Sequence, residues 1–157
     1  MILTKLILKD IDNRILAQLQ ENARLSNVDL SQKINLSQSP CLRRVKKLED
    51  AGVIKGYFAL IDQNAVGLPV SVFVSVSLEK QIESALELFE KTIKSRPEVM
   101  ECYLMTGDAD YLLRVVAKDL SAYERFVLDH LTRINGVSSI KSSFALKQVT
   151  YKTALPL

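Results

Sequence analysis

The sequence predicts an α+β protein with an N-terminal winged-type helix-turn-helix of three helices and a C-terminal ferredoxin-like domain of β-α-β-β-α-β order. Up to residue 52, apolar residues recur at helical spacing, and from residue 53 strand-like stretches alternate with two helical ones. The charge changes at the same place. Residues 1–60 carry ten Lys/Arg against six Asp/Glu, a net +4, whereas residues 61–157 carry eleven against twelve, a net −1.

Two short helices are predicted before residue 35. Asp10 or Asp12 is suited to start the first helix, which ends near residue 22. Ser26 and Asp29 have the spacing of a capping box, in which each side chain accepts from the other residue's backbone N–H, so the second helix begins there. The apolar stripes of the two helices are Ile11, Ile15, Leu16, Leu19, Val28, Leu30 and Ile34.

A third helix follows after a turn of three residues, 35–37. Ser37 or Ser39 is suited to cap it, and Pro40 is tolerated in its first turn because the N–H that proline lacks would be unpaired there. Gly52 ends the helix. The residues that should pack it against the other two helices are Leu42, Val45 and Leu48.

Four strands and two helices are predicted for the ferredoxin-like half. Residues 70–78 alternate apolar and polar side chains, as a half-buried strand does. A helix over 82–95 stops before Pro97, and strands near 99–106 and 110–117 flank Gly107. Ser121 and Glu124 form a capping box for a helix that ends at Asn135–Gly136, and a last strand runs from 137 to about 149.

The predicted domains are therefore a helix-turn-helix over 1–54, a β-strand and linker over 55–68, and the ferredoxin-like domain over 69–157. The strand in the middle segment is expected because 53–61 is rich in β-branched and aromatic residues. Residues 62–69 are rich in turn-forming residues.

Composition excludes several classes of protein. The 157 residues are 48% hydrophobic and contain no apolar run of 18, and the N-terminal eight residues are too short and broken for a signal peptide, so a cytoplasmic protein is expected. Cys41 and Cys102 match no metal or redox spacing. No metal, cofactor or catalytic residue is predicted. His130, the single histidine, is interpreted as a helix-face residue because no nucleophile or carboxylate is spaced to partner it.

The third helix has the chemistry of a DNA-reading helix. A helix, a short turn and a second helix can lay the latter in the major groove. Arginine can pair with guanine edges, and lysine, serine and a helix N-terminus suit phosphate oxygens. The alternative is a solvated basic face on an ordinary three-helix bundle. The candidate DNA-binding residues are Ser37, Gln38, Ser39, Arg43, Arg44, Lys46 and Lys47.

The loop 106–111 permits two interpretations. It joins two strands, so Gly107 and its neighbouring aspartates are explained by an ordinary turn. It also offers what a small zwitterion needs: backbone N–H groups at Gly107 for a carboxylate, and Asp108 or Asp110 for an ammonium group.

Motifs along nearly the whole chain resemble the Lrp/AsnC family of leucine-responsive and asparagine-responsive regulators. They are Asn27–Ser31, Leu36–Ser37 and Ser39–Ile54 in the first half, and Arg96–Val99, Thr106–Leu112 and Ser142–Phe144 in the second. Gln38 departs from the pattern, because relatives commonly have proline between the two serines. Residues 1–7 lie outside the resemblance.

The resemblance implies a regulator that binds double-stranded DNA, assembles from dimers, typically four in a ring, and binds an amino acid between dimers. The loop would line that site, and the last strand of a neighbouring subunit would complete it. Apolar walls favour leucine or methionine as the effector. The implied effector-binding residues are Leu104, Met105, Thr106, Gly107, Asp108, Asp110, Tyr111, Ser142, Ser143 and Phe144.

Two rival functions are weighed against the regulator. An enzyme is disfavoured because the sequence has no glycine-rich phosphate loop, metal cluster or nucleophile-base pair. A protein that wraps DNA with little ligand response remains the alternative, because large assemblies of such dimers can bend DNA.

Overall fold

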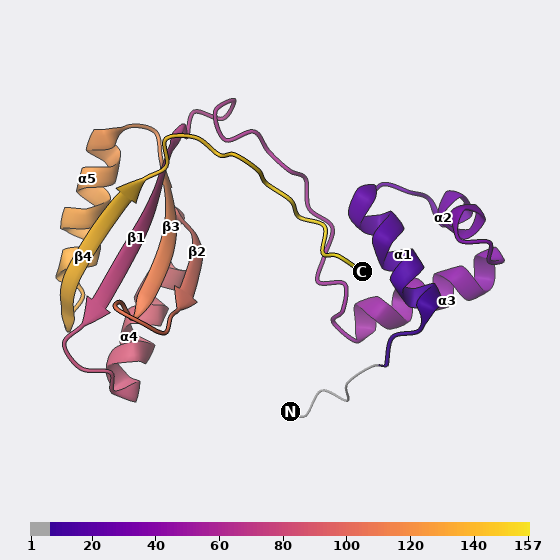
Figure 1. Ribbon diagram of the computed structural model, residues 1–157, viewed down its shortest axis with the longest axis horizontal. Coiled ribbons are helices and arrows are strands. Elements are labelled where there is room, and N and C mark those ends of the chain that lie inside the picture. Colours follow the sequence, from indigo (N-terminus) through magenta and orange to yellow (C-terminus); the bar gives the residue numbers. More distant parts are fainter. Residues whose placement is uncertain (1–6) are drawn as a thin grey trace. The chain divides into compact units, whose positions relative to one another are not determined.

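The computed structural model describes residues 7–157. Residues 1–6 of the N-terminal segment, which the sequence analysis places outside the family resemblance, lie outside the described residues. Figure 1 shows a group of helices in one part of the chain and a sheet with further helices packed on it in another. The chain forms two compact units, one of residues 1–60 with 150–157 and one of residues 61–149. Among residues 7–157, no helix is long and apolar enough to cross a membrane.

The first unit is the predicted three-helix bundle: α1 (Asp10–Glu21), α2 (Asn27–Lys33) and α3 (Gln38–Asp50). Asp12 accepts a hydrogen bond from the Lys9 backbone N–H at 2.9 Å. The Ser26 hydroxyl accepts from the Asp29 N–H at 3.1 Å and donates to the Asp29 carboxylate at 2.6 Å. The expected cap of α2 is confirmed. The core of the bundle consists of Ile15, Leu16, Leu30, Ile34, Cys41 and Leu48.

The turn between α2 and α3 is tight, as predicted. Asn35 has φ of 53°, a left-handed conformation that asparagine tolerates better than most residues. The Leu36 N–H donates to the Ser31 carbonyl at 2.9 Å. At the other end, Gly52 has φ of 68°, and the following Val53 N–H returns to the Leu48 carbonyl at 2.9 Å. This pattern ends α3 where the sequence predicts.

The strand expected within 53–61 does not form, and this prediction is wrong for the single chain. Residues 55–62 are irregular, and Tyr57, Phe58, Leu60 and Ile61 are exposed. β-branched and aromatic residues favour a strand only when another strand accepts and donates its backbone hydrogen bonds. No strand of the described part of the chain pairs with this segment.

The second unit is one antiparallel sheet of order β2-β3-β1-β4, with β1 (Val70–Leu78), β2 (Val99–Leu104), β3 (Tyr111–Ala117) and β4 (Val137–Phe144). Helices α4 (Glu83–Lys94) and α5 (Leu120–Asp129) pack on one face of it, so the β-α-β-β-α-β order is confirmed. The core between sheet and helices includes Val72, Val74, Val76, Phe89, Leu113 and Phe126.

Two boundaries in this unit differ from prediction. The cap of α5 is Asp119, whose carboxylate accepts from the Ala122 N–H at 2.6 Å, rather than Ser121. α5 also ends at Asp129, and a short 3₁₀ helix, Leu131–Arg133, follows before Gly136.

β4 ends at Phe144 rather than near 149. The Ala145 N–H donates to the Ser71 carbonyl, next to Val70, where the partner strand β1 begins, so β1 offers no further backbone groups to pair with. The residues beyond 149 belong to the first unit, where the Leu155 backbone N–H and C=O both pair with the Gln20 amide, at 2.7 and 3.2 Å. The C-terminal segment thus contacts α1 through these two hydrogen bonds.

Candidate functional site

The outward face of α3 carries most of the predicted DNA-binding residues. At 100° per residue, Ser39, Arg43 and Lys46 lie opposite the buried Cys41 and Leu48. Lys47 is exposed beside them. This gives three cations on one exposed helix face, a chemistry suited to phosphates and guanine edges.

Arg44 is the exception, because it does not project outward. Its Nη1 lies 2.9 Å from the Asp12 carboxylate, and Asp12 is 7% exposed. The ion pair joins α3 to α1 across the bundle. The guanidinium of Arg44 therefore packs two helices together, and its contact with DNA stays a prediction. No local sequence signal identifies this pair, since 32 residues separate its members.

Leu42 does not have the packing role predicted for it. Leu42, predicted to pack against the other helices, is 57% exposed, while Cys41 is fully buried in the bundle core. Burial raises the pKa of the Cys41 thiol. The apolar Leu42 lies on the same face as Arg43 and Lys46, where contact with a thymine methyl group is possible chemistry.

The N-terminus of α3 is also open to solvent. Ser37 is the N-cap residue, yet its side chain makes no capping bond, and Ser37, Gln38 and Ser39 are all exposed. The Gln38 carbonyl accepts from the Asn27 side chain at 3.0 Å, which ties the start of α3 to α2. The first-turn N–H groups remain available to a phosphate oxygen.

In the second unit, the hairpin between β2 and β3 presents the predicted ligand loop. Gly107 has φ of 120°, a conformation that side-chain-bearing residues rarely adopt, and open space surrounds it. Thr106 and Asp108 are exposed. The Met105 N–H donates to the Asp110 carbonyl at 2.8 Å and closes the loop. The backbone and one carboxylate are thus accessible at the tip.

Asp110 has a different environment from Asp108. It is 6% exposed, and its carboxylate accepts from the Leu78 backbone N–H at 2.6 Å and from the Gln81 side-chain amide. Two donors therefore already occupy this carboxylate. Asp110 anchors the loop to the end of β1, and Asp108 is the carboxylate free to meet an ammonium group.

Tyr111 belongs to the core rather than to the exposed loop. Its ring stacks on Phe89 with centroids 4.4 Å apart, and its hydroxyl donates to Glu90 at 3.2 Å. Burial, together with the nearby Glu90 carboxylate, raises the pKa of Tyr111 to about 12. The ring supports the hairpin from beneath.

The three candidate residues of β4 do not share one face. Ser142 and Phe144 pair with Val74 and Val72 and lie on the helix side, where both contact Tyr123. Ser143 pairs with Phe73 on the other face.

One chain does not bring Ser143 to the loop. Tyr111 pairs with Val76, so the two positions differ by three residues along β1 and by two strands across the sheet. The separation is about 10 Å in each direction.

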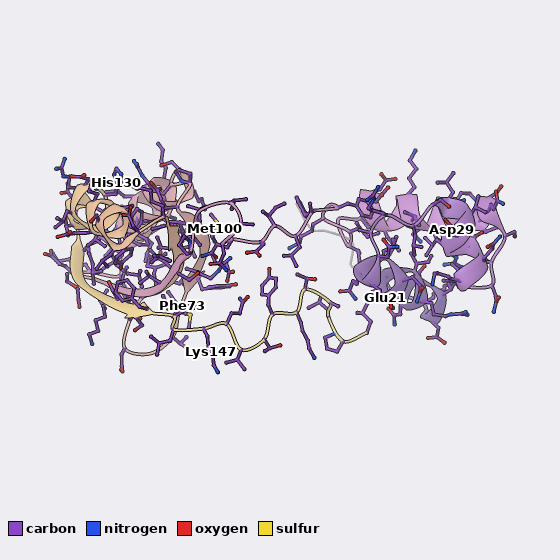
Figure 2. All side chains as sticks on the ribbon, turned by 90° about the horizontal axis from the view of Figure 1, so that it is seen from above. Glu21, Asp29, Phe73, Met100, His130 and Lys147 are labelled. Carbon is purple, nitrogen blue, oxygen red and sulfur yellow. The ribbon has the colours of Figure 1, made fainter. Side chains whose placement is uncertain are left out.

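The face of the sheet opposite the helices has no covering layer among the described residues. In Figure 2, Phe73 lies on this side of the sheet and His130 on the helix side. Arg114 donates to Glu101 at 2.7 Å, and the Tyr103 hydroxyl donates to the same carboxylate at 2.9 Å. The Arg114 hydrogen bond lowers the pKa of Glu101. The sequence analysis did not single out this network, which depends on the register between β2 and β3.

The two cysteines and the histidine belong to no candidate metal cluster in the part of the chain that the structure describes. No group of three or more His, Cys, Asp or Glu residues is placed to hold a metal within 7–157. Cys102 is exposed because β2 is an edge strand.

Comparison with known proteins matches both units. Residues 8–55 match the family described as winged helix-turn-helix DNA-binding, and residues 71–155 match the Lrp/AsnC ligand binding domain. The chain is 54% identical over 147 residues to the Bkd operon transcriptional regulator of Pseudomonas aeruginosa, covering 94% of this chain and 96% of that protein.

Solved structures are also similar to this chain. A transcriptional regulator from Neisseria meningitidis, in complex with L-Met, has 44% sequence identity and a TM-score of 0.90, and the match covers 96% of this chain and 97% of the other. An AsnC family transcriptional regulator from Agrobacterium tumefaciens has 40% identity and a TM-score of 0.89, with 95% and 97% covered.

Proposed function

Because this chain belongs to the Lrp/AsnC family of transcription regulators, we propose that α3 reads DNA and that the loop 105–110 senses a small apolar amino acid. The protein is a DNA-binding transcription regulator with a C-terminal ligand-binding domain, and it is not an enzyme. The residues, the effector and the assembly below are parts of the proposal, and so is action in the cytoplasm.

Arg43 and Lys46 are the proposed centre of the DNA contact. Both are exposed on the face of α3 that lies opposite the bundle core. Arg43 lies one helical turn after Ser39, and Lys46 lies one helical turn after Arg43. Arg43 has the planar fork that pairs with guanine O6 and N7, whereas Lys46 and Lys47 suit phosphates. Arg44 is not part of this proposed centre, because it pairs with Asp12.

Leucine or methionine is the proposed effector. Support comes from the Neisseria meningitidis regulator, whose structure contains L-Met. In this chain, Leu104 and Met105 are exposed apolar side chains next to the Gly107 backbone and the Asp108 carboxylate. Those groups would take the side chain, carboxylate and ammonium of a zwitterion, respectively.

The proposed functional form is a homodimer that assembles further. The family resemblance implies an octamer. The exposed sheet face carries Phe73 and Tyr103, two large side chains that a partner sheet would cover. The loop and Ser143 are far apart in one chain, so a second subunit would have to supply the β4 residues of the ligand site.

The exposed outward face of α3 is the observation that carries the regulator proposal, and a footprint tests it. The probe is the DNA upstream of the protein's own reading frame, with and without leucine or methionine. We expect periodic protection that changes with the ligand. Uniform protection indifferent to either amino acid would favour the DNA-wrapping alternative, and no protection would contradict DNA binding.

Calorimetry with each of the twenty amino acids tests the effector. Leucine or methionine should bind, and Asp108→Asn should weaken binding by about tenfold, the loss expected for one hydrogen bond to a charged group. Glu124→Gln, an exposed carboxylate on α5, is the matched control. If no amino acid binds at millimolar concentration, the loop is an ordinary turn.

A further inference from the structure

A pocket lies in the helix layer of the ligand-binding unit, where α4 and α5 end. Its volume is about 280 Å³, just below the range of about 300–1,000 Å³ usual for small-molecule sites. His130, labelled in Figure 2, marks it on the helix side of the sheet. Its lining includes Leu88, Arg96, Asp129, His130, Arg133 and Ile134.

Arg96 lines this pocket and has a side-chain donor without a partner in the described part of the chain. Its Nε is buried and has no hydrogen-bond partner among residues 7–157, while its Nη1 lies 3.3 Å from the His130 Nε2. A guanidinium only donates, so the His130 Nε2 is the acceptor in this contact. A buried N–H without an acceptor is unfavourable, so an acceptor from outside the chain would stabilise this arrangement.

The charges around the pocket favour an acceptor with one negative charge. Arg133 donates to Asp129 at 3.1 Å, so these two charges offset each other. The uncompensated charge in the pocket is therefore the single positive charge of Arg96. A doubly charged phosphate would leave an excess negative charge beside Asp129.

We propose that this pocket binds a small monocarboxylate, at a site separate from the loop 105–110. The carboxylate accepts from the Nε and Nη groups of Arg96 in the bidentate geometry that guanidinium favours. The apolar part of the ligand contacts Leu88 and Ile134. An amino acid is a poorer ligand, because its ammonium would lie beside Arg96 while Asp129 is already paired.

Calorimetry of the full chain with pentanoate tests the proposal, and pentanamide, which has the same shape without the charge, is the matched ligand control. We expect millimolar binding of pentanoate and none of pentanamide. Arg96→Gln should weaken pentanoate binding by about tenfold or more. Arg125→Gln removes the same charge from an exposed position of α5 and should leave binding unchanged.

Arg96→Lys provides a second variant in case the glutamine protein unfolds. It keeps the charge but lacks the Nε donor, so it should also lose most of the binding. Saturating methionine should not displace pentanoate, which distinguishes this site from the proposed effector loop and makes the two proposals fail independently. Equal binding of pentanamide, unchanged binding by either Arg96 variant, or no millimolar binding of pentanoate would overturn the monocarboxylate site.

Discussion

The DNA-reading unit and the ligand-binding unit differ in how much of their sites one chain contains. The outward face of α3 has its basic residues in place on a single helix, held by the bundle core beneath it. The ligand loop offers Gly107 and Asp108, but the β4 residues implied to complete the site lie on two faces and at a distance. A site on one helix face needs one fold, whereas a ligand site that combined the loop with these β4 residues would need a second subunit.

Residues of the same type also separate by position within each unit. Arg43 is exposed on α3 while the next residue, Arg44, pairs with the buried Asp12. Asp108 is exposed at the loop tip while Asp110 is buried and accepts two hydrogen bonds. In both units, one member of the pair is exposed and the other holds its element in place. Variants of these pairs test that division directly.

The largest effect is expected from emptying either core. Leu48→Ala and Leu113→Ala each remove a fully buried side chain from a different unit, and each should reduce the free energy of unfolding of its own unit by about 2–5 kcal/mol. Hydrogen exchange resolved by residue should show Leu48→Ala loosening α1 to α3 and Leu113→Ala loosening the sheet. If either variant loosened both units equally, the two would not be separate folding units.

The next largest effects are expected from replacing either arginine, Arg43 or Arg44, with alanine. Arg43→Ala should cost about 1–3 kcal/mol of DNA binding and reduce the salt dependence, while leaving thermal stability unchanged. Arg44→Ala should instead lower the melting temperature, because it leaves the buried Asp12 carboxylate unpaired. Fluorescence anisotropy at two salt concentrations and thermal unfolding measure both, with Lys91→Ala on α4 as the control. Unchanged DNA affinity in Arg43→Ala would contradict the assignment of the reading face.

Replacing the two aspartates of the loop, Asp108 and Asp110, should also have different effects on stability. Asp110→Ala leaves the Leu78 N–H without its acceptor and should destabilise the ligand-binding unit by about 1–3 kcal/mol. Asp108→Ala should not change stability, because the side chain is exposed. Chemical denaturation followed by circular dichroism measures both. Equal stability of the two variants would show that Asp110 does not anchor the hairpin.

Alkaline pH should weaken the ligand-binding unit through Tyr111. Its pKa is raised from 10.0 in an unfolded chain to about 12 by burial, so the folded state favours the neutral phenol. The resulting stability is complete below pH 10 and is lost as pH rises toward 12. Tyr111→Phe should therefore be less sensitive to pH in this window when unfolding is followed by circular dichroism. An unchanged pH profile would contradict the burial of the hydroxyl.

The smallest effect is expected for Gln20→Ala, which removes both hydrogen bonds to the Leu155 backbone. Because these bonds are solvent-exposed, the melting temperature should change little. The Leu155 amide should exchange faster in hydrogen exchange. Exchange as slow as in the unaltered chain would show that other contacts hold the C-terminal segment.

Local sequence signals determined most of the helix and strand order. The alternation over Val70–Leu78, the N-cap at Ser26 and the glycine after α3 each depend on neighbours within a few residues, and each is confirmed. The cap of α5 was misassigned to Ser121 because Asp119 is an equally good cap nearby. The prediction of a strand within 53–61 was wrong because a strand needs a partner strand, and composition does not specify one.

By itself, the sequence determined the fold class, the basic helix and the loop with Gly107, since periodicity, charge and turn chemistry act over short stretches of chain. The tertiary structure decided which arginine is free, which aspartate is buried and where β4 ends. Those outcomes depend on groups that meet across tens of residues, such as Asp12 with Arg44 and Asp110 with Leu78. Chain folding brings such groups within hydrogen-bonding distance, and no short-range pattern records them.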